Sequence, residues 1–365
     1  MTKHILIIVG TRPNFIKVTQ FKKEAKAFSN LSIKIAHTGQ HFDSKMADVF
    51  FEQFNLIPDV FFNIKPASAN SQMAEIMIKL EAEIIANKPD LIVVVGDVNS
   101  TFAAAITANK MGVKIAHLES GLRSYDRTMP EEHNRVLTDD ITDYFFVTEQ
   151  SGYDNLINEK KNKDHIYFVG NTMIDTLVAF QKEIDATQVL DELKIQPHKF
   201  ILMTMHRPAT VDDEEGLNKL ATLIKSLGSN FKIVFPIHPR TLKNIDRFGL
   251  TPNFKNNPNL ILTEPLDYFS FQKLVKEAKL ILTDSGGIQE ESTFLQVPCL
   301  TLRPNTERPI TVTLGSNELV PFNTEIILNK VNEIINGHAK KGEIPPFWDG
   351  KTTQRILKII DNLLN

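Results

Sequence analysis

The sequence predicts an α/β fold of two Rossmann-like domains, each with a doubly wound parallel sheet, facing a cleft. Short apolar runs of strand length alternate with segments of helical periodicity along the chain, which is typical of a parallel sheet covered by helices. The alternation pauses once, from Asp175 to about Pro197, where a helical run ends in a polar stretch. Because 365 residues are enough for two domains with a core each, we interpret this pause as a linker.

The first half of the chain contains six predicted strands with helical segments between them. The apolar runs that predict the strands are 4–10, 33–39, 90–97, 113–120, 143–148 and 166–172. A helix is expected from the turn after Gly10 to about Phe28, and further helices at 46–54, 73–86, 99–112 and 129–142. Pro130 and the acids that follow it are typical of a helix start.

The second half restarts the same architecture without repeating the sequence. Its predicted strands lie in the runs 199–208, 231–239, 260–266, 279–287 and 297–304. The last helical run, 352–364, is expected to cross back and pack on the first domain. The predicted domains are therefore 1–175, with 352–365 packed on it, and 176–351.

Composition excludes several classes of protein. Lys plus Arg number 41 against 44 Asp plus Glu, so there is no basic excess that would indicate a nucleic-acid partner. No apolar run reaches the roughly 18 residues of a membrane span. Met1–His4 lead directly into the first strand, leaving no room for a signal peptide, and Cys299 is the only cysteine. We therefore expect a cytoplasmic protein without an internal disulfide or a membrane partner.

Charged residues, histidines and glycines gather where the apolar strands end. In parallel sheets of this kind, ligands bind beyond the carboxyl ends of the strands. The residues at these ends are Gly10, Thr11, Arg12, Gln40, His41, Gly96, Asp97, Glu119, Ser120, Gly121, His206, Arg207, His238, Pro239 and 284–287.

Each of these residues also has an ordinary structural explanation. Asp97 could cap the following helix, and Glu131 and Glu132 could complement a helix dipole. His206 could be a buried, hydrogen-bonded core histidine, and Arg12 could pair with a surface acid. Their joint placement at the ends of strands favours a binding site over these separate explanations.

The turn at 284–287 has the pattern of a phosphate site. The sequence Asp-Ser-Gly-Gly follows a buried strand and opens a helix, where glycine lets a ligand approach the backbone and the first N–H groups have no partner within the helix. Glu290 and Glu291 follow about one turn later, within reach of a sugar attached to that phosphate. The alternative is an ordinary strand-to-helix turn in which Asp284 or Ser285 is the N-cap.

Motifs of several other enzyme classes are missing. The chain has no G-x-G dinucleotide fingerprint, no G-x-x-x-x-G-K-[ST] loop, no H-E-x-x-H and no D-x-D, and its histidines lack the spacing of metal ligands. We expect no cofactor and no metal.

Nine segments, in order along nearly the whole chain, resemble motifs of the non-hydrolysing UDP-N-acetylglucosamine 2-epimerases. They are GTRPNFIK (10–17), HTGQH (37–41), VVGD (94–97), HLESGLRS (117–124), MPEEHNR (129–135), VGNTMID (169–175), MHRP (205–208), LTDSGGIQEE (282–291) and TERP (306–309).

The resemblance implies a glycosyltransferase-B-type fold with the active site between the domains, a homodimer, and a UDP-sugar substrate. It implies interconversion of UDP-N-acetylglucosamine and UDP-N-acetylmannosamine by elimination of UDP to a 2-acetamidoglucal and re-addition. The implied catalytic residues are Asp97, Glu119, Glu131 and His206. The residues implied to hold UDP and its diphosphate are Arg12, Lys17, Ser285, Gly286, Gly287, Glu291 and Arg308.

Two further points concern the substrate. Gln40, His41, Arg207 and His238 match a second, activating nucleotide-sugar site of some bacterial members, but the segment 65–72 lacks the Arg-Gln pair expected there. The segments 37–43 and 121–132 also resemble a branch that acts on UDP-2,3-diacetamido-glucuronic acid. A UDP-sugar glycosyltransferase and a non-catalytic nucleotide-sugar-binding protein are the alternatives outside the epimerases.

Overall fold

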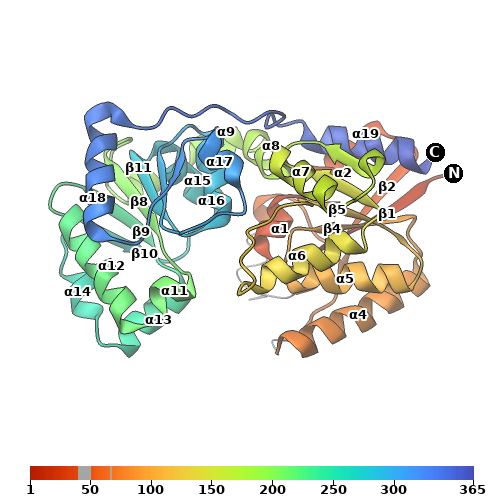
Figure 1. Cartoon of the computed structure of the whole chain (residues 1–365), viewed down its shortest axis with the longest axis horizontal. Coiled ribbons are helices and arrows are strands. Elements are labelled where there is room, and N and C mark those ends of the chain that lie inside the picture. The colour runs from red at the N-terminus through yellow and green to blue at the C-terminus, as the bar shows by residue number, and fades with distance from the viewer. Residues whose placement is uncertain (40–50, 66–67) are drawn as a thin grey trace. The chain divides into compact units, whose positions relative to one another are not determined.

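The computed structural model describes residues 1–39, 51–65 and 68–365, which form two compact units (Figure 1). The first unit comprises Met1–Ala179 and Pro346–Asn365, and the second comprises Phe180–Pro345. The first unit takes in the chain from Pro346 onward because Trp348 is buried there and donates from Nε1 to the carbonyl oxygen of Thr148, at 3.1 Å.

The first unit is built on a seven-stranded parallel sheet with the order β3-β2-β1-β4-β5-β6-β7. Its strands are β1 (Lys3–Val9), β2 (Leu31–His37), β3 (Val60–Phe61), β4 (Leu91–Val95), β5 (Lys114–Leu118), β6 (Tyr144–Val147) and β7 (Ile166–Phe168). All five residues of β4 are buried, as expected for a central strand covered on both faces.

Helices cover both faces of this sheet (Figure 1). On one face lie α4 (Ala69–Ala86), α5 (Asn99–Lys110) and α6 (Pro130–Asp140). The same face carries α7 (Gln150–Asn158), whose Leu156 packs on Phe145 and Val147. On the other lie α1 (Arg12–Ile16), α2 (Phe21–Glu24), α8 (Thr172–Ala179) and α19 (Thr352–Leu364). Asp175 ties α19 to this unit, because its two carboxylate oxygens accept from the backbone N–H groups of Thr352 and Thr353 at the helix start.

The second unit has a six-stranded parallel sheet with the order β10-β9-β8-β11-β12-β13. Its strands are β8 (Phe200–Thr204), β9 (Lys232–Pro236), β10 (Leu260–Thr263), β11 (Leu280–Thr283), β12 (Cys299–Thr301) and β13 (Asn317–Leu319). Together the two sheets confirm the predicted class of two doubly wound Rossmann-like domains.

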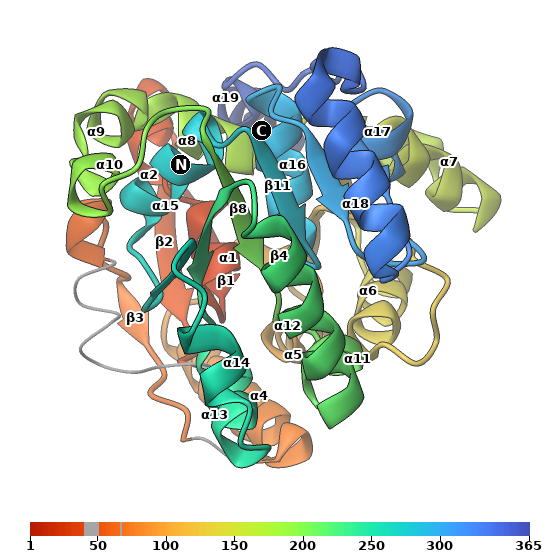
Figure 2. The same ribbon diagram turned by 90° about the vertical axis from the view of Figure 1, so that its left-hand side faces the viewer.

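Figure 2 turns the second unit toward the viewer, with helices on both sides of its sheet. One face carries α12 (Glu214–Leu227) and α18 (Thr324–Glu333), and the other carries α9 (Gln181–Ala186), α10 (Val189–Glu192) and α15 (Tyr268–Glu277). The remaining helices are α11 (Pro208–Val211), α13 (Pro239–Arg247), α14 (Thr251–Lys255), α16 (Gly286–Phe294) and α17 (Pro309–Thr313).

One expected helix is broken. The segment from Gly10 to about Phe28 contains α1, α2 and a 3-10 turn at Ala25–Ala27 in place of a single helix. The hydroxyl of Thr176 donates to the carbonyl oxygen of Ile16, the last residue of α1. The contact joins residues 160 positions apart, so local periodicity could not predict it.

In each sheet the strand order runs in one direction from a central strand and then in the other, which creates one topological switch point. In the first unit the switch lies between β1 and β4, and in the second between β8 and β11. In open parallel sheets, ligands bind beyond the carboxyl ends of strands at such a switch. The chain leaves β4 at Gly96 and Asp97, and it leaves β11 at the turn 284–287.

Candidate functional site

Gly96 shapes the turn that follows β4. Its φ of +66° is in the left-handed region, which glycine adopts without strain. A Cβ at this position would also lie 3.1 Å from Nδ2 of Asn14, so space and conformation both favour glycine. The turn presents Asp97 directly after the strand.

Glu119 and Lys17 form a buried ion pair beside this turn. Nζ of Lys17 lies 2.5 Å from Oε2 of Glu119, and both side chains are almost fully buried. Glu119 itself has a φ of +69°, a conformation that is costly for a residue with a Cβ and that is often found at functional sites. Arg12, at the start of α1, is half-buried.

Arg135 joins two further carboxylates. Its guanidinium forms short ion pairs with Asp97 and with Glu132, which lies one turn before it on α6. Glu132 also accepts from the backbone N–H and the hydroxyl of Ser124, both at 2.9 Å, and from the backbone N–H of Tyr125 at 2.9 Å. Asp97, Arg135 and Glu132 therefore form one connected network.

The structure does not bring Glu131 into that network. Its side chain is exposed, whereas the adjacent Glu132 is 4 % exposed. The buried face of α6 is polar and consists of Glu132, Asn134, Arg135, Thr138 and Asp139. Sequence spacing does not distinguish the two glutamates, because Glu131 and Glu132 lie at i, i+4 and i, i+3 from Arg135 and both spacings allow an ion pair on a helix.

In the second unit, Asp284 organises the loop after β8. Its Oδ2 accepts from the backbone N–H groups of His206 and Arg207 at 2.9 and 2.8 Å, and its Oδ1 lies 2.9 Å from Nδ1 of His206. Burial raises the pKa of Asp284, but the hydrogen bonds and the charge of His206 outweigh it, and the pKa lies below its ordinary value. Asp284 therefore remains a carboxylate at neutral pH.

No side-chain cap from the described residues occupies the start of α16, so its first backbone N–H groups remain available to a ligand. Asp284 is committed to the loop after β8, and Ser285, at the N-cap position, makes no side-chain cap hydrogen bond with any residue that the structure describes. The ordinary capped turn, which the sequence left open, is therefore not what this structure has. Gly287 follows as the second residue of the helix.

Arginines and buried glutamates surround Gly286. Nε of Arg308 lies 2.8 Å from Oε2 of Glu290, and its Nη1 donates to Oε1 of Glu307 at 2.6 Å. Nη2 of Arg303 donates to Oε2 of Glu307 at 3.1 Å. A Cβ at Gly286 would lie 2.7 Å from Oε1 of Glu307 and 2.9 Å from Nη1 of Arg308. Glu291, on the same helix, is also buried.

A hollow of about 280 Å³ adjoins this turn within the second unit. Its lining combines His206, His238 and Ser285 with apolar side chains that include Phe271. The rings of the two histidines lie 5.6 Å apart, and burial together with the charge of His206 lowers the pKa of His238.

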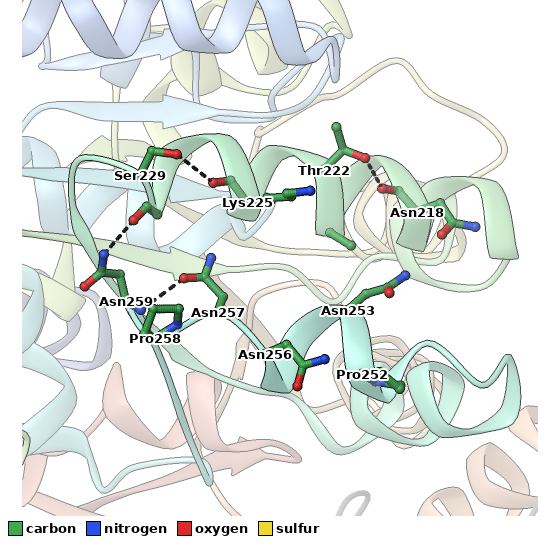
Figure 3. Close-up of a pocket in the computed structure, with 12 residues that line it drawn as sticks. Asn218, Thr222, Lys225, Ser229, Pro252, Asn253, Asn256, Asn257, Pro258 and Asn259 are labelled. Carbon is green, nitrogen blue, oxygen red and sulfur yellow. Dashed lines mark hydrogen bonds between the residues drawn. The ribbon is translucent and has the colours of Figure 1, made fainter.

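A larger hollow of about 700 Å³ lies elsewhere in the second unit (Figure 3). Residues of α12 and α14 and the loop before β10 line it, and five of them are asparagines: Asn218, Asn253, Asn256, Asn257 and Asn259. Lys225 is the only charged residue in its lining. It contains none of the predicted site residues and no acid that could transfer a proton.

Two of the residues predicted for a second nucleotide-sugar site, Gln40 and His41, fall outside the described residues. Across the part of the chain that the structure describes, no three His, Cys, Asp or Glu side chains are grouped to hold a metal ion. In the same part, no helix has both the length and the apolar character needed to cross a membrane.

Comparison with known proteins identifies the family. A family model described as UDP-N-acetylglucosamine 2-epimerase matches residues 23–361. The chain is 39% identical to a UDP-N-acetylglucosamine 2-epimerase of Methanococcus maripaludis over 97% of both chains. It is 34% identical to a UDP-2,3-diacetamido-2,3-dideoxy-D-glucuronate 2-epimerase of Pseudomonas aeruginosa, over 98% of this chain and 99% of the relative.

A solved structure extends the likeness to three dimensions. The Methanocaldococcus jannaschii UDP-GlcNAc 2-epimerase, in complex with UDP-GlcNAc and UDP, matches with a TM-score of 0.90 and 38% identity, over 98% of this chain and 99% of that one. This likeness supports the glycosyltransferase-B-type fold class. The family match over most of the sequence confirms the resemblance, and the chain belongs to the UDP-N-acetylglucosamine 2-epimerase family.

Proposed function

We propose that this protein is a non-hydrolysing epimerase that interconverts UDP-N-acetylglucosamine and UDP-N-acetylmannosamine. One observation carries the proposal: in a chain of this family, the ends of β4 and β5 and the start of α6 gather three carboxylates, each paired with a cation. Glu119 and Glu132 are buried, and Asp97 is half-buried. Binding an anionic nucleotide sugar would not by itself require acids at these positions. Inversion of a carbon through proton transfer does require them.

The chemistry of C2 explains this requirement. The proton on C2 is not next to a carbonyl, so it is too weakly acidic for simple removal and return. Departure of UDP from C1 as that proton is removed gives 2-acetamidoglucal. UDP then adds back while a proton arrives at C2 on the opposite face. The reaction needs an acid or base on each face of C2 and stabilisation of the charge that develops on the diphosphate.

We propose Asp97, Glu119 and Glu132 as the carboxylates of this reaction. The resemblance gave the third role to Glu131, but the exposed side chain of Glu131 lies outside the network, while Glu132 shares Arg135 with Asp97. Lys17 lies against Glu119, and Arg135 lies against both Asp97 and Glu132.

For the diphosphate, we propose the start of α16 together with Arg308, Arg12 and Lys17. The N–H groups of α16 and the nearby guanidinium of Arg308 support this role. Ser285, Gly286 and Gly287 let the backbone approach the anion, and we propose that Glu291 holds the nucleoside. His206, oriented by Asp284, is proposed to act on the leaving group or to position the sugar.

Three further proposals concern the sugar, the location and assembly of the protein, and its activation. The greater identity to a UDP-N-acetylglucosamine 2-epimerase, 39% against 34%, favours that sugar over the diacetamido-glucuronate. We also propose a cytoplasmic homodimer on the resemblance alone. Weak or absent activation by a second substrate molecule is proposed because the segment 65–72 departs from the activated members.

The test of the function is incubation with UDP-N-acetylglucosamine alone, followed by proton NMR. We expect the signals of UDP-N-acetylmannosamine to grow without an acceptor, and UDP-2,3-diacetamido-glucuronic acid to react more slowly. A substrate that stays unchanged until a sugar acceptor is added would instead indicate a glycosyltransferase. A bound but unchanged substrate under both conditions would indicate a binding protein.

The adjacent glutamates provide a matched pair of variants. Glu132→Gln keeps the shape of the side chain but removes its proton-transfer capacity, and it should lower turnover by about a hundredfold or more. Glu131→Gln, with its exposed side chain, should leave turnover nearly unchanged. Steady-state rates would be compared after circular dichroism shows that both variants are folded. The opposite order of effects would return the role to Glu131.

Gly286→Val tests the anion site. The new side chain would collide with the carboxylate of Glu307 and the guanidinium of Arg308 and would fill the space above the turn. We expect calorimetry to show loss of UDP binding. Ser229→Val, at an exposed position in the same unit, is the control and should bind UDP like the parent. Equal UDP affinities in the two variants would remove the phosphate role of this turn.

A further inference from the structure

His117 is a fully buried residue of β5 whose two ring nitrogens both face oxygen atoms. Nε2 lies 2.7 Å from the carbonyl oxygen of Gly96, and Nδ1 lies 2.7 Å from Oδ1 of Asp139. A carbonyl oxygen only accepts hydrogen bonds, so Nε2 carries a proton. The state of Nδ1 depends on Asp139.

The surroundings of Asp139 keep that carboxylate ionised. Its Oδ2 lies 2.8 Å from Nη1 of Arg123 and accepts from the backbone N–H of Gly121 at 3.0 Å. The guanidinium of Arg123 and the N–H of Gly121 therefore favour the ionised form of Asp139 through Oδ2, whatever the state of His117. Oδ1 of this carboxylate, like the carbonyl oxygen of Gly96, can only accept from the ring, so both nitrogens of His117 donate and the ring is an imidazolium.

The side chains of His117, Asp139, Arg123 and Glu159 form a series of alternating charges whose sum is zero. Arg123 continues from Asp139 to Glu159, to which it donates from Nε and Nη2 at 2.8 and 2.7 Å. Glu159 is one-third exposed, so this series of two cations and two anions ends at the solvent. A buried imidazolium is therefore compatible with the fold, because its charge is paired and both of its N–H groups are satisfied.

His117, at the other end of this series, contacts the turn after β4 that carries Asp97. The carbonyl oxygen that His117 holds belongs to the peptide joining Gly96 to Asp97. The backbone N–H of Gly96 donates to Leu118 at 3.0 Å, and a Cβ at Gly96 would lie 3.6 Å from Oε2 of Glu119 and 3.7 Å from Nζ of Lys17. The hydrogen bond from His117 thus acts where three of the proposed site residues converge.

We propose that His117 is a positioning residue for the epimerase reaction: its imidazolium holds the carbonyl of Gly96 and thereby fixes Asp97 and the neighbouring Lys17–Glu119 pair. The inference rests on the proposed function. A charged donor makes a stronger hydrogen bond than a neutral one, so the turn is held firmly without contact between His117 and the substrate. Small displacements of reacting groups are costly for turnover.

Two substitutions separate positioning from a purely structural role. The amide nitrogen of asparagine falls near the place of Nδ1, and that of glutamine near the place of Nε2. His117→Asn therefore keeps a donor toward Asp139 and loses the bond to Gly96, whereas His117→Gln keeps a donor toward Gly96 and loses the bond to Asp139. Both variants lose the positive charge and one buried hydrogen bond, so their stabilities should fall by similar amounts.

The experiment compares both variants with the parent in steady-state assays with UDP-N-acetylglucosamine. We expect His117→Asn to lower kcat about tenfold or more with KM little changed, and His117→Gln to retain most of the turnover. Equal losses of kcat in the two variants, or parent-like turnover in folded His117→Asn, would overturn the positioning role. A parent enzyme that does not epimerise the substrate would instead count against the proposed function.

NMR of the parent tests the geometry without relying on activity or on variants that fold. In protein labelled with ¹⁵N-histidine, the His117 ring should show two slowly exchanging N–H protons at neutral pH and the nitrogen shifts of an imidazolium. A neutral ring at pH 7, with one nitrogen unprotonated, would overturn the proposal.

Discussion

Paired burial of opposite charges is the constraint on which the candidate site of the first unit depends. An ion without a partner in such surroundings would cost several kcal/mol, on the order given for buried charges, so each carboxylate requires its cation. Lys17 forms an ion pair with Glu119, and Arg135 forms ion pairs with both Asp97 and Glu132. Because buried ion pairs add little net stability compared with apolar side chains, chemistry explains their accumulation here better than folding does.

In the second unit, backbone N–H groups and arginines surround the turn that is proposed to bind the diphosphate. Asp284 orients His206 and the loop after β8, which leaves the first turn of α16 without a side-chain cap from the described residues. Arg308 lies beside Gly286 and is itself held by Glu290 and Glu307. The proposed proton-transfer carboxylates thus lie in the first unit, and the turn proposed for the diphosphate lies in the second.

Much of this could be predicted from the sequence, because strands buried on both faces are apolar runs and their ends carry the polar residues. The positions that could not be predicted depend on contacts between distant residues. The contact from the hydroxyl of Thr176 to Ile16, at the end of α1, joins residues 160 positions apart. Glu131 and Glu132 can be told apart only once the polar face of α6 is buried. His117 looks like an ordinary core histidine until its two oxygen partners are known.

The central claim is that C2 inverts by elimination and re-addition, with protons exchanged through protein carboxylates. The most direct measurement is the reaction of UDP-N-acetylglucosamine in heavy water, followed by NMR of C2. The carboxylates exchange with solvent between turnovers, so the product should carry deuterium at C2, and both epimers should carry it at equilibrium. Small amounts of UDP and 2-acetamidoglucal should also be released. Retention of the original C2 proton through a full inversion would contradict the account.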